Sequence, residues 1–201
     1  MEKTEITEKS EIKEQKKSKS KKSTALSVAS VAMMTALIAV CSWITIPLGD
    51  IPITFQTFAV YMTVCMLGMK KGLISTTVYL LLAAVGAPVL SGFRGGIGAL
   101  LGATGGYVVG FVFLALISGL LIDKFGKKTY IMFIALILGT VILYAFGTVW
   151  YKVVYLKNTG DISALVVLGK CVFPYIVPDL VKMALAVFLS KAVQSRIKIK
   201  D

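Results

Sequence analysis

The stretch PYIVPDLVKMALAVFLSKAV, residues 174–193, decides the fold, because it has the length and apolar character of a membrane-crossing helix. Asp179 and Lys182 lie inside it, three residues apart, which places both on one face of a helical turn. A charge at the middle of a bilayer costs about 2.5–3.5 kcal/mol on insertion scales, so such a pair indicates a functional polar site.

The composition of the whole chain supports a membrane location. Of its 201 residues 57% are hydrophobic and only 16% are charged, against about 25% charged residues in soluble domains. The mean hydropathy is +0.84. The apolar runs lack the alternation of membrane barrel strands. The sequence therefore predicts an all-α integral membrane protein.

Several chemistries are excluded by residues and motifs that the sequence lacks. There is no histidine, which removes histidine-based acid–base catalysis and histidine metal sites. The three cysteines are widely spaced and form no CxxC motif, and no GxxxxGK[ST] phosphate loop occurs. We expect no catalytic residue, metal or cofactor, and any active work must draw its energy from another subunit.

The chain divides into a tail and a membrane domain. Residues 1–23 carry eight Lys and five Glu with few large apolar side chains, which predicts a basic, disordered cytoplasmic tail. Residues 24–201 form the predicted membrane domain. Its six candidate spans are Thr24–Thr45, Thr54–Met69, Gly72–Ala87, Gly98–Ile122, Thr129–Tyr151 and Pro174–Val193.

The distribution of Lys and Arg orients these six spans. With the N-terminus inside, seventeen of the 22 fall on the inner side and four on the outer side, and Lys182 lies within the last span. Cytoplasmic loops are enriched in Lys and Arg, so both termini are predicted to face the cytoplasm. The net charge of +12 then reflects contact with anionic lipid and needs no nucleic acid to explain it.

Polar groups converge at the outer end in this topology. Asp179 and Lys182 fall in the outer half of span six, and Gln56 and Arg94 lie on the same side. They predict a pocket for a small polar or anionic solute. Two structural alternatives stay open: Pro178 starts a helix whose dipole Asp179 stabilises, with Lys182 pairing to it, or Arg94 snorkels to lipid headgroups.

Glycines and aromatic residues mark the region between spans three and four. Glycines at 98, 102, 106 and 110 form a stripe that favours close helix packing. Those at 92, 95 and 96, around Arg94, indicate an irregular loop that is buried or lines a cavity. The aromatic side chains of Trp43, Tyr79, Tyr107 and Tyr175 either line the pocket or form an interfacial belt.

Span one carries a regular series of alanines. Ala25, Ala29, Ala32, Ala36 and Ala39 recur with a period of 3.5 residues and make a smooth seam. The seam serves either packing inside the bundle or docking of a partner protein. The segment 46–56 contains two prolines and a glycine, which end both neighbouring helices and predict a short external lid.

Three segments resemble one family. IPITFQTFAVYM (51–62), YLLLAAVGAPVLSGFRGGIGALLGATGGYVVGF (79–111) and PYIVPDLVKM (174–183) resemble, in this order, the BioY family of biotin-specific S components of energy-coupling factor (ECF) transporters. The resemblance covers most of residues 25–195. It implies six helices in a prokaryotic plasma membrane and capture of biotin from outside.

The resemblance also implies partners and site roles. A transmembrane coupling protein would dock on an AxxxA-like surface of span one, and two ATPases would power import. Asp179 would accept from the ureido N–H groups of biotin, Lys182 would donate to the ureido carbonyl, and Arg94 or Gln56 would meet the acidic tail. Tyr79, Tyr107 and Trp43 would lie against the apolar ring.

Other functions fit the same residues. A carrier or S component for another small solute would use a similar polar cluster, and a screen of labelled vitamins separates this alternative from biotin capture. A membrane enzyme using Asp179 with Lys182 as an acid–base pair is less well supported, since no nucleophile or second carboxylate accompanies the pair. A purely structural membrane protein would bind no ligand saturably.

Overall fold

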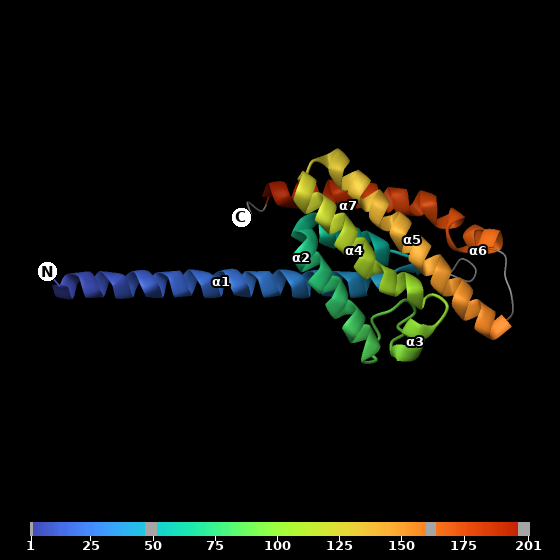
Figure 1. Cartoon of the computed structure of the whole chain (residues 1–201), viewed down its shortest axis with the longest axis horizontal. Coiled ribbons are helices and arrows are strands. Elements are labelled where there is room, and N and C mark those ends of the chain that lie inside the picture. Colours follow the sequence, from blue (N-terminus) through green and yellow to red (C-terminus); the bar gives the residue numbers. More distant parts are fainter. Residues whose placement is uncertain (1, 47–51, 160–163, 197–201) are drawn as a thin grey trace.

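The computed structural model describes the backbone of residues 2–46, 52–159 and 164–196, and side chains over 23–46, 52–156, 166–169 and 171–196. Helices account for nearly all of it (Figure 1). They are α1 (Glu2–Trp43), α2 (Gln56–Ala84), α3 (Ile97–Leu101), α4 (Gly105–Phe125), α5 (Thr129–Thr159), α6 (Ala164–Cys171) and α7 (Phe173–Arg196). Strands β1 (Thr45–Ile46) and β2 (Ile53–Thr54) form a short antiparallel pair.

Helix α2 is at the centre of the bundle. Helices α1, α4 and α7 pack on it, and α5 packs mainly on α4. Four segments are long and apolar enough to cross a membrane: Ser23–Trp43, Gln56–Ala84, Gly105–Phe125 and Thr129–Leu156. The predicted class of helical membrane protein is therefore confirmed, whereas the count of six spans stays a prediction.

The backbone of α2 reverses direction at Gly68. Gly68 has φ +74° and ψ −170°, which is not helical and which a side chain would disfavour. A Cβ placed on Gly72 would lie 3.4 Å from Cα of Val64, although these residues would be about 12 Å apart along a continuous helix. The two halves of α2 thus match the second and third predicted spans and lie side by side.

Neighbouring helices hold this reversal. The carboxylate of Asp123, near the end of α4, accepts a hydrogen bond from the backbone N–H of Met69 at 3.0 Å. Gln194 of α7 donates to the carbonyl of Cys65 at 2.9 Å. The turn of α2, the end of α4 and the end of α7 therefore meet at one end of the bundle.

Close packing between α4 and α5 depends on glycine, but on a different set from the predicted stripe. Helix α4 begins at Gly105, so Gly98 and Gly102 lie outside it, in α3 and at its end. Gly106 and Gly110 do face α5, against Trp150 and Leu143. The predicted stripe is wrong for its first half, because the chain breaks between α3 and α4.

Two predictions concern segments at the edge of the described structure. Residues 47–51 of the predicted lid lie outside the described residues; its flanks form β1 and β2. Helix α1 begins at Glu2, so the backbone of residues 2–23 is helical where the composition predicted disorder. Lys and Glu have high helix propensity, which accounts for the difference. That residues 1–23 form a tail separate from domain 24–201 stays a prediction.

Candidate solute site

The buried ion pair of α7 forms the floor of the site. Asp179 and Lys182 are 4% and 5% exposed, and Nζ of Lys182 lies 2.8 Å from Oδ1 of Asp179. Helix α7 starts at Phe173, well before Pro178, so Asp179 lies in its second turn. The interpretation of Asp179 as an acid in the first turn of its helix is therefore wrong.

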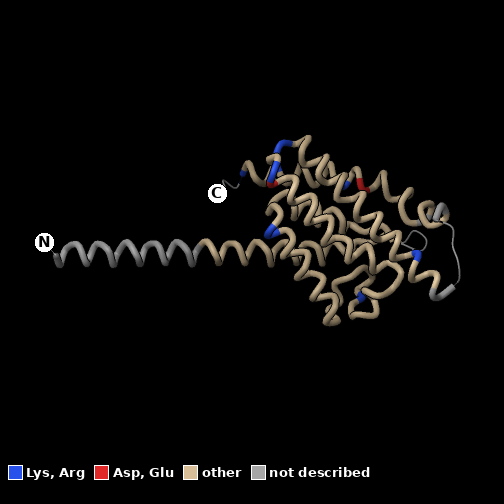
Figure 2. The backbone as a smooth tube through the Cα atoms, viewed as in Figure 1, with Lys and Arg blue, Asp and Glu red and all other residues tan. Residues whose placement is uncertain are grey.

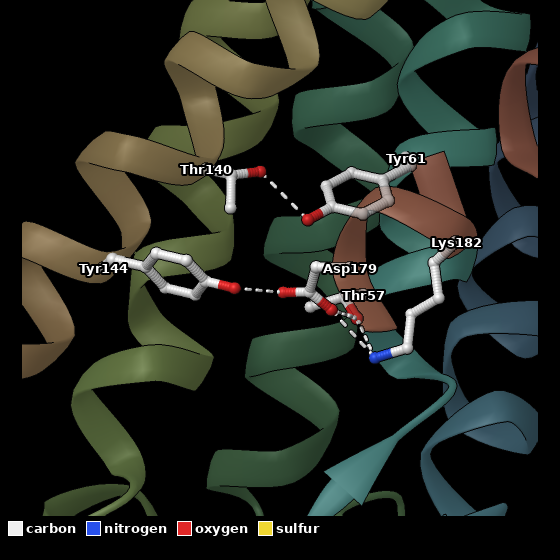
Figure 3. Close-up of polar contacts among 6 residues, drawn as sticks. All are labelled: Thr57, Tyr61, Thr140, Tyr144, Asp179 and Lys182. Atoms are coloured by element: carbon white, nitrogen blue, oxygen red, sulfur yellow. Dashed lines mark hydrogen bonds and ion pairs between the residues drawn. The ribbon is translucent and has the colours of Figure 1, made fainter. Parts of the chain in front are cut away.

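Two further side chains complete the surroundings of the Asp179 carboxylate (Figure 3). Thr57, at the start of α2, donates to Oδ1 at 3.2 Å and accepts from Nζ of Lys182 at 3.1 Å. Tyr144 of α5 donates to Oδ2 at 2.6 Å. Side chains of α2, α5 and α7 therefore meet at the Asp179 carboxylate. Their hydrogen bonds offset part of the cost of burying the two charges.

Thr57 and Tyr144 were not predicted from the sequence, although one signal pointed to Tyr144. Thr140, Tyr144 and Thr148 recur every four residues in the otherwise apolar stretch 131–149, which puts their hydroxyls on one face. Beside the site, Thr140 and the fully buried Tyr61 share a hydrogen bond of 2.9 Å (Figure 3). Tyr144 therefore belongs to a polar stripe whose hydroxyls reach α2, α4 and α7.

The ion pair opens into a cavity of about 100 Å³. Its wall comes from the β2 region, the start of α2, the loop before α3, and helices α3 to α7. The lining residues are Pro52, Thr54, Gln56, Thr57, Leu90, Ser91, Arg94, Ala99, Thr104, Tyr107, Val108, Phe111, Leu143, Tyr144, Cys171, Tyr175, Asp179 and Lys182. The cavity thus combines polar groups on the ion-pair side with aromatic and aliphatic walls, as small-molecule sites do.

Five of the seven predicted ligand contacts line this cavity: Asp179, Lys182, Gln56, Arg94 and Tyr107. Arg94 is exposed at the wall, donates from Nε to the carbonyl of Ser91 at 3.1 Å, and has no ion pair with the described acidic side chains. Tyr107 shares a hydrogen bond of 3.3 Å with Thr148. Five residues named from the sequence therefore lie together at one cavity, and their contact with a ligand stays a prediction.

Tyr79 and Trp43 lie behind the wall, which corrects the expectation of direct ligand contact. Tyr79 is fully buried, accepts from Nε2 of Gln56 at 2.7 Å and donates to the carbonyl of Val89 at 2.9 Å. Trp43 donates to the carbonyl of Pro88 at 2.9 Å and stacks on Phe93. The periodicity of a helix does not say which aromatic ring reaches a cavity and which supports it.

The loop between α2 and α3 covers the site and is tied to α1. Ser42 donates to the carbonyl of Val89, and Thr45 shares a hydrogen bond of 3.1 Å with Ser91. A Cβ on Gly95 would lie 2.2 Å from the carbonyl oxygen of Ala87, so only glycine fits this crossing. The predicted irregular, cavity-lining loop is confirmed.

The fold and the site together define a helical membrane protein with a buried ion pair at the wall of a small-solute cavity. The chain belongs to the BioY family, whose model matches residues 14–199. It is 37% identical over 161 residues to the biotin transporter BioY of Thermotoga maritima, covering 79% of this chain and 89% of that one. The biotin transporter BioY of Rhizobium etli is 36% identical over 151 residues, with coverages of 71% and 78%.

A solved structure has the same fold. The crystal structure of the S-component for biotin from an ECF-type ABC transporter matches with a TM-score of 0.78 and 28% sequence identity, covering 86% of this chain and 93% of that chain. The predicted family and the prediction of a transport protein instead of an enzyme are both confirmed.

Proposed function

We propose that this chain is the S subunit of an ECF-type transporter and captures biotin from the extracellular side of a prokaryotic plasma membrane. The observation that carries the proposal is the buried ion pair of Asp179 and Lys182, hydrogen-bonded to Thr57 and Tyr144, at one wall of a cavity. Its relatives in Thermotoga and Rhizobium are named as biotin transporters. Biotin is then the transported ligand, and no cofactor takes part.

The chemistry of biotin fits the cavity. Its ureido ring offers two N–H donors and one carbonyl, which suit an acceptor at Asp179 and a donor at Lys182. The nitrogen Nζ of Lys182 has three N–H donors, of which Asp179 and Thr57 use two. The apolar ring would lie against Tyr107 and the acidic tail would meet Arg94 or Gln56, since a guanidinium matches a carboxylate in shape.

Saturable binding to the full-length chain purified in detergent tests this function. Calorimetry should show one biotin per chain, and desthiobiotin, which keeps the ureido ring, should compete. A screen with other labelled vitamins serves as the specificity control. Absence of biotin binding by folded protein, or saturable binding of a different vitamin in its place, contradicts the proposal.

We expect Tyr144→Phe to weaken biotin binding by about tenfold, since a hydrogen bond to a charged group contributes about 1.5–3 kcal/mol. The substitution removes the donor that holds Oδ2 of Asp179 in place. The matched control is Tyr130→Phe on the same helix, where the ring is 60% exposed. Equal affinities of the two variants would show that Tyr144 does not position the carboxylate.

The topology that goes with this function has six spans and both termini in the cytoplasm. It counts the two halves of α2 separately and includes α7. One end of the bundle holds the connections at residues 68–71 and 126–128 together with the end of α7. Figure 2 shows Lys and Arg gathered at this end. That end would face the cytoplasm under the positive-inside rule.

The alanines of α1 supply the surface for a coupling protein. Ala25, Ala29, Ala32 and Ala36 are all exposed, whereas Thr35, Ile38 and Ala39 are buried against the bundle. This exposure favours docking over internal packing. A transmembrane coupling protein would approach closely along such a row of small side chains, and two ATPase subunits would supply the energy.

We expect Ala29→Trp to abolish co-purification with the coupling protein and uptake of biotin, while leaving biotin binding by the isolated subunit intact. A Trp side chain at this position would hold the two helices apart. Leu138→Trp on α5, at an exposed site, is the control. A complex that forms normally with Ala29→Trp places the docking surface elsewhere, and the Ala32–Ala36 register is then tested in the same way.

A further inference from the structure

A second, larger hollow lies outside the solute cavity, between α5 and α7. This groove has a volume of about 580 Å³. The surface of its walls is almost entirely apolar, with Ile137, Val141 and Val149 from α5 and Ile176, Leu180 and Met183 from α7. Thr140 and Thr148 also line it, and their hydroxyls share hydrogen bonds with those of Tyr61 and Tyr107. The solute site does not account for it.

The groove reaches the back of the solute site. Tyr144 and Asp179 line both the solute cavity and the groove. The hydrogen bond of 2.6 Å between their side chains therefore lies between the two (Figure 3). Direct contact between α5 and α7 is slight compared with the packing of α4 on α5 or of α7 on α2. Whatever fills the groove therefore supports the outer side of the Tyr144 ring.

The position of the groove in the bilayer identifies its occupant. Val141 and Val149 are 57% and 65% exposed, and Leu180 is 45% exposed. They continue the apolar outer surface of α5, one of the candidate spans, which faces hydrocarbon in a membrane protein. The groove is thus an indentation of the lipid-facing surface and is continuous with it.

An apolar groove of this size is expected to hold neither ordered water nor empty space. Apolar cavities stay dry, and an engineered one of about 150 Å³ takes up benzene; the groove is several times larger. The surrounding bilayer supplies flexible hydrocarbon chains at the same depth. We propose that the groove is a binding site for one acyl chain of a membrane lipid, seated between α5 and α7 against Tyr144.

Photo-crosslinking in nanodiscs tests the site. The full chain is reconstituted with a phosphatidylcholine that carries a diazirine in one acyl chain, irradiated and mapped by mass spectrometry. We expect several-fold more adduct per residue on the groove positions of α5 and α7 than on Ile134 and Val153 of α5, which are 56% and 51% exposed and do not line the groove. Equal labelling of all these positions means bulk lipid only and overturns the proposal.

A matched pair of variants sharpens the result. Val141→Trp fills the groove and should remove the excess labelling, while Val153→Trp, a change of the same type on the same helix, should preserve it. Excess labelling that persists in a folded Val141→Trp variant contradicts the site. If Val141→Trp does not fold, the comparison within the unmodified chain still decides. Absence of lipid adducts on the groove positions, with Ile134 and Val153 still labelled, would mean that something other than lipid covers the groove and would overturn the proposal.

Discussion

Asp179→Ala should weaken biotin binding by on the order of 10- to 100-fold or more, since each lost charged hydrogen bond contributes about 1.5–3 kcal/mol. The change removes the proposed acceptor for the ureido N–H groups. It also leaves Lys182, 5% exposed, as a buried charge without its partner, which is strongly destabilising. Isothermal calorimetry on the purified variant measures the loss of biotin affinity. The affinity for analogues without the ureido group should change little between the variant and the unmodified chain.

Controls separate ligand contact from damage to the fold. Asp179→Asn keeps one of the two acceptor oxygens, enough for either Thr57 or Tyr144, and loses the charge. It should fold better than Asp179→Ala and still bind weakly. Asp123→Ala removes a carboxylate that holds α4 to the turn of α2 through Met69, away from the cavity. It should lower thermal stability while leaving biotin affinity unchanged. Unaltered affinity in a folded Asp179 variant would falsify the assignment.

Gly119→Val should cause a large loss of stability without touching the site. A Cβ on Gly119 would lie 2.5 Å from Cα of Met69 and 3.0 Å from its backbone nitrogen. The obstacle is backbone at the reversal of α2, so α2 and α4 must separate; overpacking of this kind costs about 1–3 kcal/mol or more. We expect a lower melting temperature and a lower monodisperse yield in detergent.

Gly98→Ala is the matched control, because a Cβ there meets nothing within 4 Å. Its melting temperature should stay unchanged or rise slightly, since alanine favours helix over glycine. If Gly119→Val and Gly98→Ala behave alike, the contact between α4 and the α2 turn is not tight. Loss of the hydrogen bond from Met69 to Asp123 in the Gly119 variant should accompany its instability.

Much of the fold could be read from hydropathy and charge. The apolar runs located the membrane helices, and the interruption at Lys70 and Lys71 separated the two spans that α2 contains; the structure places the reversal at Gly68. The boundaries near α3 were less accurate: the predicted span from Gly98 begins seven residues before α4. Apolar glycine-rich sequence is compatible with both a membrane helix and an irregular loop, and only packing against α2 separates them.

The candidate site divides in the same way. Asp179 and Lys182 were identifiable because a charge in an apolar run is unusual whatever the arrangement of the helices. Thr57 and Tyr144 are ordinary residues in sequence, and they become part of the site only through contacts with Asp179 across 122 and 35 residues. Tyr79 shows the reverse error, since its ring supports Gln56 from behind.

The sequence by itself determined that this chain is a helical membrane protein of the BioY family with two anomalous charges in the first half of its last apolar run. These properties depend on local composition and on the order of motifs, which survive in any arrangement of the helices. Only the tertiary structure decided which hydroxyls hold Asp179, which aromatic rings line the cavity, and that an apolar groove backs Tyr144. The reason is that such contacts join helices that are distant in the chain. Their geometry depends on how side chains pack in three dimensions, which the order of residues does not specify.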